Sequence, residues 1–352
     1  MDGSNQHWQP PGTDPAQPPQ AHGQSPAQGH YVYGGPHGPV PYPNYPPATR
    51  GPWALAPASG TRFDHMARNA VNTWWRPLVG SLLVAVGFLA VGVSVIMVGS
   101  VVAVIAGVPV AATSGRLFGD PLFELTVSLL SLALVLPVVY LVAWAVQRRP
   151  PGTLSSVAGR VRWRWLGICV LIAVVAQVLG QVASVAALAL SGHSTSGVFG
   201  WVGWESFLPA ILVVLLIVPF QAAAEEYALR GWLIQAFGAV LRTPWPGILV
   251  GAVIFASLHG YTDWGVVDVL LFGALMGWLA VRTGGLEAPI ALHVVNNVMA
   301  FGVSAAAGTL ENALIQGSVP WQYFVGTFVQ LSVFALLVCR FAVRRGVPTL
   351  SG

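Results

Sequence analysis

Eight long apolar runs recur between Pro77 and Cys339, and few charged side chains interrupt them. A helix that crosses the hydrocarbon core of a bilayer needs about 20 such residues. Backbone groups in lipid must be paired within the segment, which favours helices. The runs lie at residues 77–110, 121–147, 165–190, 208–237, 246–260, 264–281, 286–304 and 321–339. The sequence therefore predicts an all-α polytopic integral membrane protein with about eight transmembrane helices, of which the fifth and sixth are short.

The composition agrees with this fold class. Only 8% of the residues are charged, whereas soluble domains carry about 25%. All 16 basic residues are arginines, which indicates a GC-rich coding bias and a bacterial source. The charge lies beside the apolar runs, so we expect membrane lipids as partners and no nucleic acid. Cys169 and Cys339 lie in separate runs, which does not favour a disulfide framework.

The first 60 residues differ in composition from the rest of the chain. They hold 14 of the 27 prolines, interleaved with Gln, Gly, His and Tyr. A segment of this kind buries too little apolar surface to offset the entropy lost on ordering. We therefore predict a disordered cytoplasmic tail at residues 1–60 and a helical membrane domain at residues 61–345.

The arginines indicate the orientation of the chain. Positive charge is enriched in cytoplasmic loops of membrane proteins. With eight spans, one side of the membrane receives Arg50, Arg62, Arg68, Arg76, Arg148, Arg149, Arg160, Arg162, Arg164, Arg242, Arg282, Arg340, Arg344 and Arg345. The other side receives only Arg116. The sequence thus predicts a multi-pass protein of the cell membrane with both termini in the cytoplasm.

A few ionisable or strongly polar residues lie inside the apolar runs. Each charged residue costs about 2.5–3.5 kcal/mol at the middle of a span. The polar residues inside the runs are Glu225, Glu226, Arg230, His259, His293 and Asn297. A rise of 1.5 Å per residue places Glu225, His259 and His293 roughly 18, 16 and 10 Å from the cytoplasmic helix ends. We expect these groups to line a water-filled cavity that opens to the cytoplasm.

Helical geometry separates the two adjacent acids. Glu226 and Arg230 are four residues apart with the acid first, which favours an ion pair on one face. Glu225 is rotated by about 100° from Glu226, so it is predicted to stay outside that pair. His293 and Asn297 also share a helix face. The pattern leaves one carboxylate held by arginine and one available for chemistry.

Two further expectations concern the residue beside His259 and the acids outside the motifs. Phe255 lies four residues before His259 and is predicted to form an aromatic wall beside it. Six other acids lie at predicted helix ends or loops, where solvated side chains are expected. They are Asp120, Glu124, Glu205, Asp263, Glu287 and Glu311, and Asp268 is assigned to the same group despite lying a few residues inside the sixth run.

The polar residues also have structural and transport interpretations. A glutamate–arginine pair can serve only as a structural clamp, and an intramembrane histidine often acts as an interhelical hydrogen-bond partner. Intramembrane Glu, Arg and His also occur on proton pathways of transporters. The chain contains no HExxH zinc motif and no GxSxG nucleophile turn.

Three motifs occur in order along the chain: EEYALR at residues 225–230 fits EExxxR, FASLH at 255–259 fits FxxxH, and HVVNN at 293–297 fits HxxxN. Together they resemble the CPBP family, which groups CAAX prenyl endopeptidases with bacteriocin-processing and bacteriocin-immunity membrane proteins. The resemblance covers a motif-bearing core at about residues 205–305.

The resemblance implies a role for each motif residue. Glu225 activates a water for attack on a peptide carbonyl, and His259 holds that water or a metal. His293 and Asn297 stabilise the oxyanion, or His293 is a second metal ligand. A divalent metal such as zinc at His259 and His293 is one form of the site, and a metal-free glutamate base with an oxyanion hole is the other. The motif further implies that Glu226 and Arg230 position these groups.

The sequence thus predicts a membrane endopeptidase that cleaves a peptide bond near the cytoplasmic face of the bilayer. A leader peptide, a bacteriocin-like precursor or a membrane-protein segment is the expected substrate. The alternatives are a non-catalytic immunity or scaffold protein and an ion-coupled transporter. The sequence predicts no particular oligomeric state.

Overall fold

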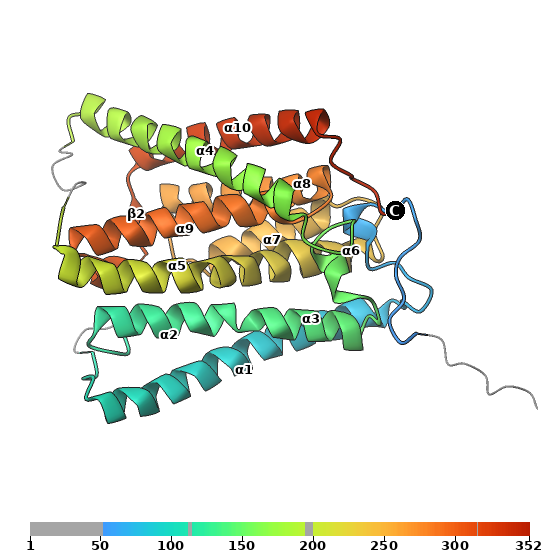
Figure 1. Ribbon diagram of the computed structural model, residues 1–352, viewed down its shortest axis with the longest axis horizontal. Helices are drawn as coiled ribbons and strands as arrows, with labels where there is room; N and C mark the ends of the chain where they lie inside the picture. The colour runs from blue at the N-terminus through green and yellow to red at the C-terminus, as the bar shows by residue number, and fades with distance from the viewer. Residues whose placement is uncertain (1–51, 112–114, 194–199, 315) are drawn as a thin grey trace, which may run out of the picture. The chain divides into compact units, whose positions relative to one another are not determined.

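The computed structural model describes residues 52–111, 115–193, 200–314 and 316–352, and this part of the chain is mostly helical (Figure 1). The α-helices are α1 Trp75–Ala106, α2 Pro121–Ala133, α3 Val135–Ala145, α4 Trp163–Leu190, α5 Trp204–Glu226, α6 Ile234–Gly238, α7 Trp245–Ser257, α8 Trp264–Thr283, α9 Glu287–Ala307 and α10 Trp321–Arg344. The shorter elements are η1 Phe63–His65, η2 Pro151–Leu154, η3 Tyr227–Leu233, β1 Thr262–Asp263, η4 Leu310–Asn312 and β2 Ser318–Val319.

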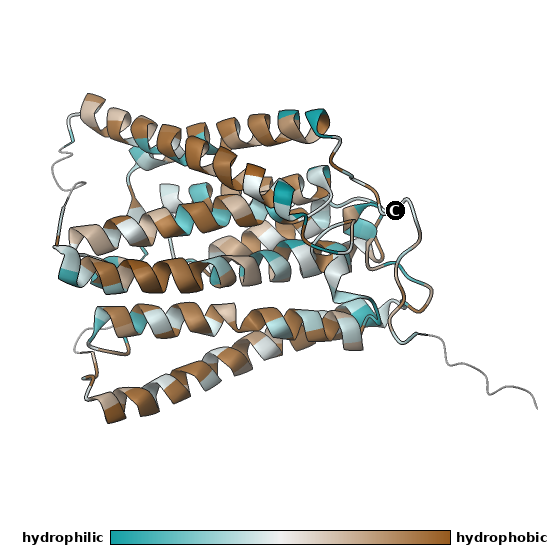
Figure 2. Ribbon diagram, in the orientation of Figure 1, coloured by the Kyte–Doolittle hydropathy of each residue, from teal (hydrophilic) through white to brown (hydrophobic). Residues whose placement is uncertain are grey.

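Seven helical stretches in the described residues are long and apolar enough to cross a membrane, with α2–α3 and α5–α6 each counted as one. Helix α7 has 13 residues and is shorter than a span. These helices confirm the predicted polytopic all-α fold and the short fifth run. The prediction that the sixth run is also short was wrong, because α8 has 20 residues and is long enough to cross the bilayer. Figure 2 shows apolar residues along the helices and hydrophilic residues gathered near the end that holds the C-terminus.

Two predicted spans contain interruptions. The run at 121–147 is divided at Leu134 into α2 and α3. Pro137 lacks an N–H and crowds the carbonyl of Ala133, which explains the break. The run at 208–237 changes after Glu226 into the π-helix η3 before α6 begins. Such π segments are rare, and many of them occur at functional sites.

The helices are held together by a few large pairwise contacts. Helix α4 packs against α10 and α9, and α5 packs against α9 and α2. Helices α7 and α8 form an antiparallel pair, and the turn between them carries β1, which pairs in parallel with β2. Figure 1 shows α1 with α2 and α3 on one side of α5, α7 and α9, and α4 with α10 on the other.

The segment before α1 packs against the C-terminal segment. The Gly60 amide donates to the Ser351 carbonyl at 2.9 Å, and the Trp53 indole donates to the Trp144 carbonyl at 3.1 Å. Residues 52–60 of the predicted tail therefore contact the helical domain. Residues 1–51 lie outside the described part of the chain, so the prediction of a disordered tail stays a prediction there.

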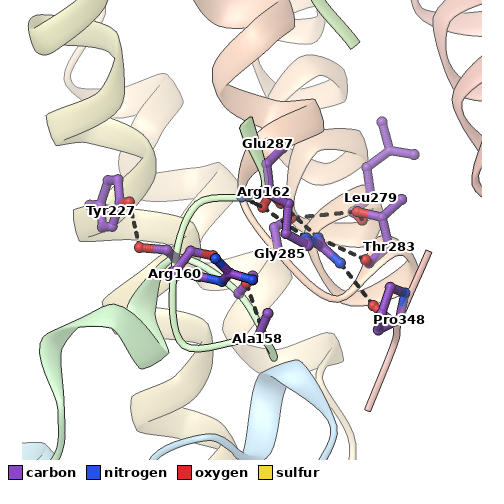
Figure 3. Close-up of polar contacts among 11 residues, drawn as sticks. Ala158, Arg160, Arg162, Tyr227, Leu279, Thr283, Gly285, Glu287 and Pro348 are labelled. Atoms are coloured by element: carbon purple, nitrogen blue, oxygen red, sulfur yellow. Dashed lines mark hydrogen bonds and ion pairs between the residues drawn. The ribbon is translucent and has the colours of Figure 1, made fainter. Parts of the chain in front are cut away.

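A buried ion pair between Arg162 and Glu287 joins the loop before α4, the end of α8, the start of α9 and the segment after α10 (Figure 3). Glu287 accepts hydrogen bonds from the Arg162 side chain through both oxygens, at 2.8 and 2.7 Å. The same guanidinium donates to the carbonyls of Thr283 and Pro348. The expectation that Glu287 is solvated was wrong, because its side chain is only 1% exposed. Glu124 is buried too, and it accepts from the Phe118 amide at 2.7 Å.

Replacement of Arg162 tests the contribution of this clamp. We expect Arg162→Met to lower the free energy of unfolding by about 1.5–3 kcal/mol, the range for hydrogen bonds to charged groups. Arg160→Met is the matched control, because Arg160 lies in the same loop and is exposed. The measurement is the thermal unfolding midpoint in detergent. Equal midpoints for the two variants would contradict a stabilising clamp.

Candidate active site

A cavity of about 830 Å³ lies among the helices and contains the polar side chains predicted from the motifs. Glu225, His259, His293 and Asn297 all line it. They come from the end of α5, the turn after α7 and the middle of α9. The structure thus brings three segments together, as the depth estimate predicts, and the wall around them is largely apolar.

Glu226 and Arg230 form the predicted pair behind this wall. Arg230 Nη1 lies 3.0 Å from Glu226 Oε1, and the two side chains are 1% and 0% exposed. The guanidinium carbon also lies 4.4 Å from the centroid of the Phe255 ring, within the range of a cation–π interaction. The arginine is therefore fixed by a carboxylate and by an aromatic face.

His293 is the second partner of Glu226. Its Nδ1 lies 2.8 Å from the Glu226 Oε1 that also accepts from Arg230. A carboxylate oxygen accepts, so Nδ1 carries the hydrogen and Nε2 points to the other side of the ring. There Nε2 lies 3.8 Å from Glu225 Oε2. His293 thus separates the arginine-bound acid from the free acid.

Aromatic rings fix the plane of the His293 imidazole. The centroids of the Phe255 and Phe272 rings lie 5.7 and 5.6 Å from it, both nearly perpendicular to it. The residue is 2% exposed. Packing and one hydrogen bond together hold Nε2 in the cavity wall.

Glu225 has a different environment from Glu226. Its side chain is 15% exposed and makes no contact with Arg230 among the hydrogen bonds of the described residues. Gln221, one turn earlier on α5, donates to Glu225 Oε1 at 2.5 Å. The division into a held and a free carboxylate, predicted from the 100° rotation, is confirmed by these contacts.

Gln221 is a site residue that the motifs did not identify. Its carbonyl oxygen accepts from Asn297 Nδ2 at 3.1 Å, so one side chain joins Glu225 to α9. Gln221 is 4% exposed. A polar residue four positions before Glu225 in an apolar run was the available sequence signal. Helical spacing places it on the face of Glu225.

His259 lies just beyond the end of α7. Its Nδ1 donates to the Phe255 carbonyl at 2.7 Å, and the two ring centroids are 4.2 Å apart. The predicted aromatic wall beside His259 is therefore confirmed. Because Nδ1 donates, Nε2 of the neutral ring carries a lone pair.

The described residues contain no group of three or more His, Cys, Asp and Glu side chains arranged to hold a metal ion. A catalytic zinc commonly has three protein ligands. His293 Nδ1 is already bound by Glu226, which leaves only Nε2 of each histidine and Glu225 as donors. These donors do not converge as a three-ligand site. Metal binding by His259 and His293 stays a prediction.

Comparisons with known proteins agree with the motifs. Residues 204–299 match the family model described as type II CAAX prenyl endopeptidase Rce1-like. The chain is similar to the uncharacterized protein YyaK of Bacillus subtilis (strain 168), with 26% identity over 235 residues, which covers 64% of this chain and 77% of that protein. No solved structure matches the chain. The resemblance stated from the three motifs is thus confirmed over residues 204–299, which carry Glu225, His259 and His293 and are similar to the type II CAAX prenyl endopeptidases of the Rce1-like family.

Proposed function

We propose that the protein is an intramembrane endopeptidase that hydrolyses a peptide bond with a glutamate-activated water. The observation that carries the proposal is the separation of the two acids. Glu226 is occupied by Arg230 and His293, whereas Glu225 faces the cavity with Gln221 as its hydrogen-bond donor. A purely structural clamp would need Glu226 but would not need Glu225.

The reaction begins with a water between Glu225 and His259. The Glu225 carboxylate removes one proton from the water, and the lone pair on His259 Nε2 accepts a hydrogen bond that orients the oxygen. The oxygen forms a bond to the scissile carbonyl carbon. The protonated Glu225 then gives its proton to the leaving nitrogen as the C–N bond breaks, so one water is consumed.

His293 and Asn297 stabilise the oxyanion. When His293 carries both ring protons, Glu226 binds Nδ1–H and Nε2–H is free to donate into the cavity. A carboxylate on the far side of an imidazole stabilises the imidazolium and fixes its orientation. Asn297 uses one amide hydrogen for Gln221 and retains the second for the oxyanion. Glu226 and Arg230 act through His293 as positioning residues.

We assign the arginine-rich end of the helices to the cytoplasm because positive charge is enriched there. Glu225 lies in the half of the α5–α6 span nearer this end, and His293 lies in the half of α9 nearer this end. Cleavage then occurs near the cytoplasmic face of the membrane. The absence of lysine indicates a GC-rich coding bias and therefore a bacterial source. For a bacterial protein we favour a leader peptide or a membrane-protein segment as the substrate.

Cleavage by the reconstituted protein tests the proposal. The wild-type protein in liposomes is incubated with a library of apolar peptides, and the products are identified by mass spectrometry. We expect cleavage in the wild type and a loss of roughly 10²–10⁴-fold in His293→Ala, the range for a lost oxyanion-hole donor or a mispositioned acid–base group. His193→Ala is the matched control, because His193 lies at the far end of α4. Absence of cleavage over the whole library would contradict the proposal.

The same assay, repeated with a chelator, tests whether cleavage requires a metal ion. Because the donors do not converge as a three-ligand site, we expect full activity after treatment with a chelator. The metal content of the purified wild type is compared with that of His259→Ala and His293→Ala. Stoichiometric zinc that both variants lose, together with activity restored only by zinc, would overturn the metal-free mechanism.

A further inference from the structure

Asp268 is an acid in the cavity that the proposed reaction does not use. It lies on α8, and its Oδ2 accepts a hydrogen bond from the Thr327 hydroxyl of α10 at 3.1 Å. Its Oδ1 is buried and has no hydrogen-bond partner among the described residues. Both Asp268 and Thr327 line the same cavity as Glu225. The expectation that Asp268 is a solvated helix-end residue was wrong.

No basic side chain in the described part of the chain compensates this charge. The residues that line the cavity include no arginine, and the sequence contains no lysine. The guanidinium of Arg230 is bound to Glu226 instead. A carboxylate in surroundings of low dielectric constant is costly unless it is paired. The cavity therefore carries two acids, Glu225 and Asp268, without an arginine or lysine partner.

The position of Asp268 suits a substrate that already contacts His293. Phe272 lies one turn further along α8, on the same face as Asp268, and its ring centroid is 5.6 Å from that of His293. One helical turn adds about 5.4 Å along the axis, so Asp268 lies on the order of 10 Å from the imidazole. An extended peptide covers about 3.3 Å per residue. A side chain about three residues from the scissile bond reaches this carboxylate.

We propose that Asp268, oriented by Thr327, forms a subsite that binds a cationic side chain of the peptide substrate, an arginine or a lysine. This inference rests on the proposed function, because it takes the ligand to be the peptide that is cleaved. The incoming cation pairs with the Asp268 carboxylate, which lines the cavity and has one oxygen without a hydrogen-bond partner among the described residues. Tyr261 and Tyr323 line the same cavity, and tyrosine rings attract cations. The subsite selects the register in which an apolar peptide enters the site.

Binding of matched peptides tests the subsite. The probes are fluorescent apolar peptides in which a single arginine is moved along the sequence, each with a twin that carries uncharged citrulline at that place. Binding is measured in the Glu225→Gln protein, so a failure of hydrolysis leaves this result intact. In one register we expect the arginine peptide to bind at least tenfold more tightly than its twin, because hydrogen bonds between charged groups are stronger than those between neutral ones.

Variants assign the preference to the charge of Asp268. In Asp268→Asn, which keeps the shape and the oxygen that accepts from Thr327, we expect equal binding of the two twins. Thr327→Val keeps the carboxylate and should keep most of the preference. Glu311→Gln is the control, because Glu311 is an exposed acid in the outer loop. An unchanged preference in Asp268→Asn, or equal losses in Asp268→Asn and Thr327→Val, would overturn the proposal.

Discussion

Glu225→Gln is expected to reduce kcat for peptide cleavage by roughly 10²–10⁴-fold, the range for loss of a general base. The amide has the shape of the acid and can still accept from Gln221, but it cannot take a proton from water. The KM should change little, because the variant preserves the cavity. Initial rates at several peptide concentrations in liposomes separate the two constants.

The control for this variant is Glu205→Gln, since Glu205 is an exposed acid at the start of the same helix. We expect it to cleave at the wild-type rate. The thermal midpoint of Glu225→Gln should equal that of the wild type, because Glu225 has no arginine partner to lose. Cleavage by Glu225→Gln within about twofold of the wild type would remove Glu225 from the reaction. Proton-coupled uptake that depends on Glu225, without any cleavage, would support a transporter instead.

Among the variants proposed, Arg230→Met is expected to lower the free energy of unfolding most, by about 3–5 kcal/mol. The reason is that it leaves the buried carboxylate of Glu226 without its cation. Glu226 is 0% exposed, so water cannot replace the guanidinium. The thermal unfolding midpoint in detergent is the measurement. Arg242→Met serves as the control, since Arg242 is an exposed arginine in the turn between α6 and α7.

A double variant separates the charge from the shape of this pair. Glu226→Gln with Arg230→Met removes both charges, and we expect it to recover most of the lost stability. It should not recover cleavage, because His293 then lacks the carboxylate that binds Nδ1. A double variant as unstable as Arg230→Met would indicate that packing, rather than the buried charge, sets the cost.

Local geometry explains why part of the site was predictable. Glu226 with Arg230, Phe255 with His259 and Gln221 with Glu225 are each four residues apart, and a helix places such residues on one face. The pairing of Glu226 with Arg230 holds across the start of the π-helix η3. The sequence alone could not show that π-helix, because tertiary packing determines where one extra residue is inserted.

Contacts between distant residues were not predictable in the same way. His293 binds a carboxylate 67 positions earlier, and the motif alone did not indicate that Glu226 would share its oxygen between His293 and Arg230. The burial of Glu287 depends on Arg162, 125 positions away. Asp268 lies near a helix end, where solvent is expected, but α10 covers it through Thr327.

The amino-acid sequence by itself determined the polytopic helical fold, the family resemblance of the motif-bearing core and the face on which each polar side chain lies. These properties follow from hydropathy and from the period of a helix, which are local. Only the tertiary structure decided which carboxylate binds His293, which histidine nitrogen faces the cavity and which carboxylate oxygen lacks a partner. Those answers depend on how α5, α8, α9 and α10 pack, because burial and long-range hydrogen bonds arise only when separate helices meet.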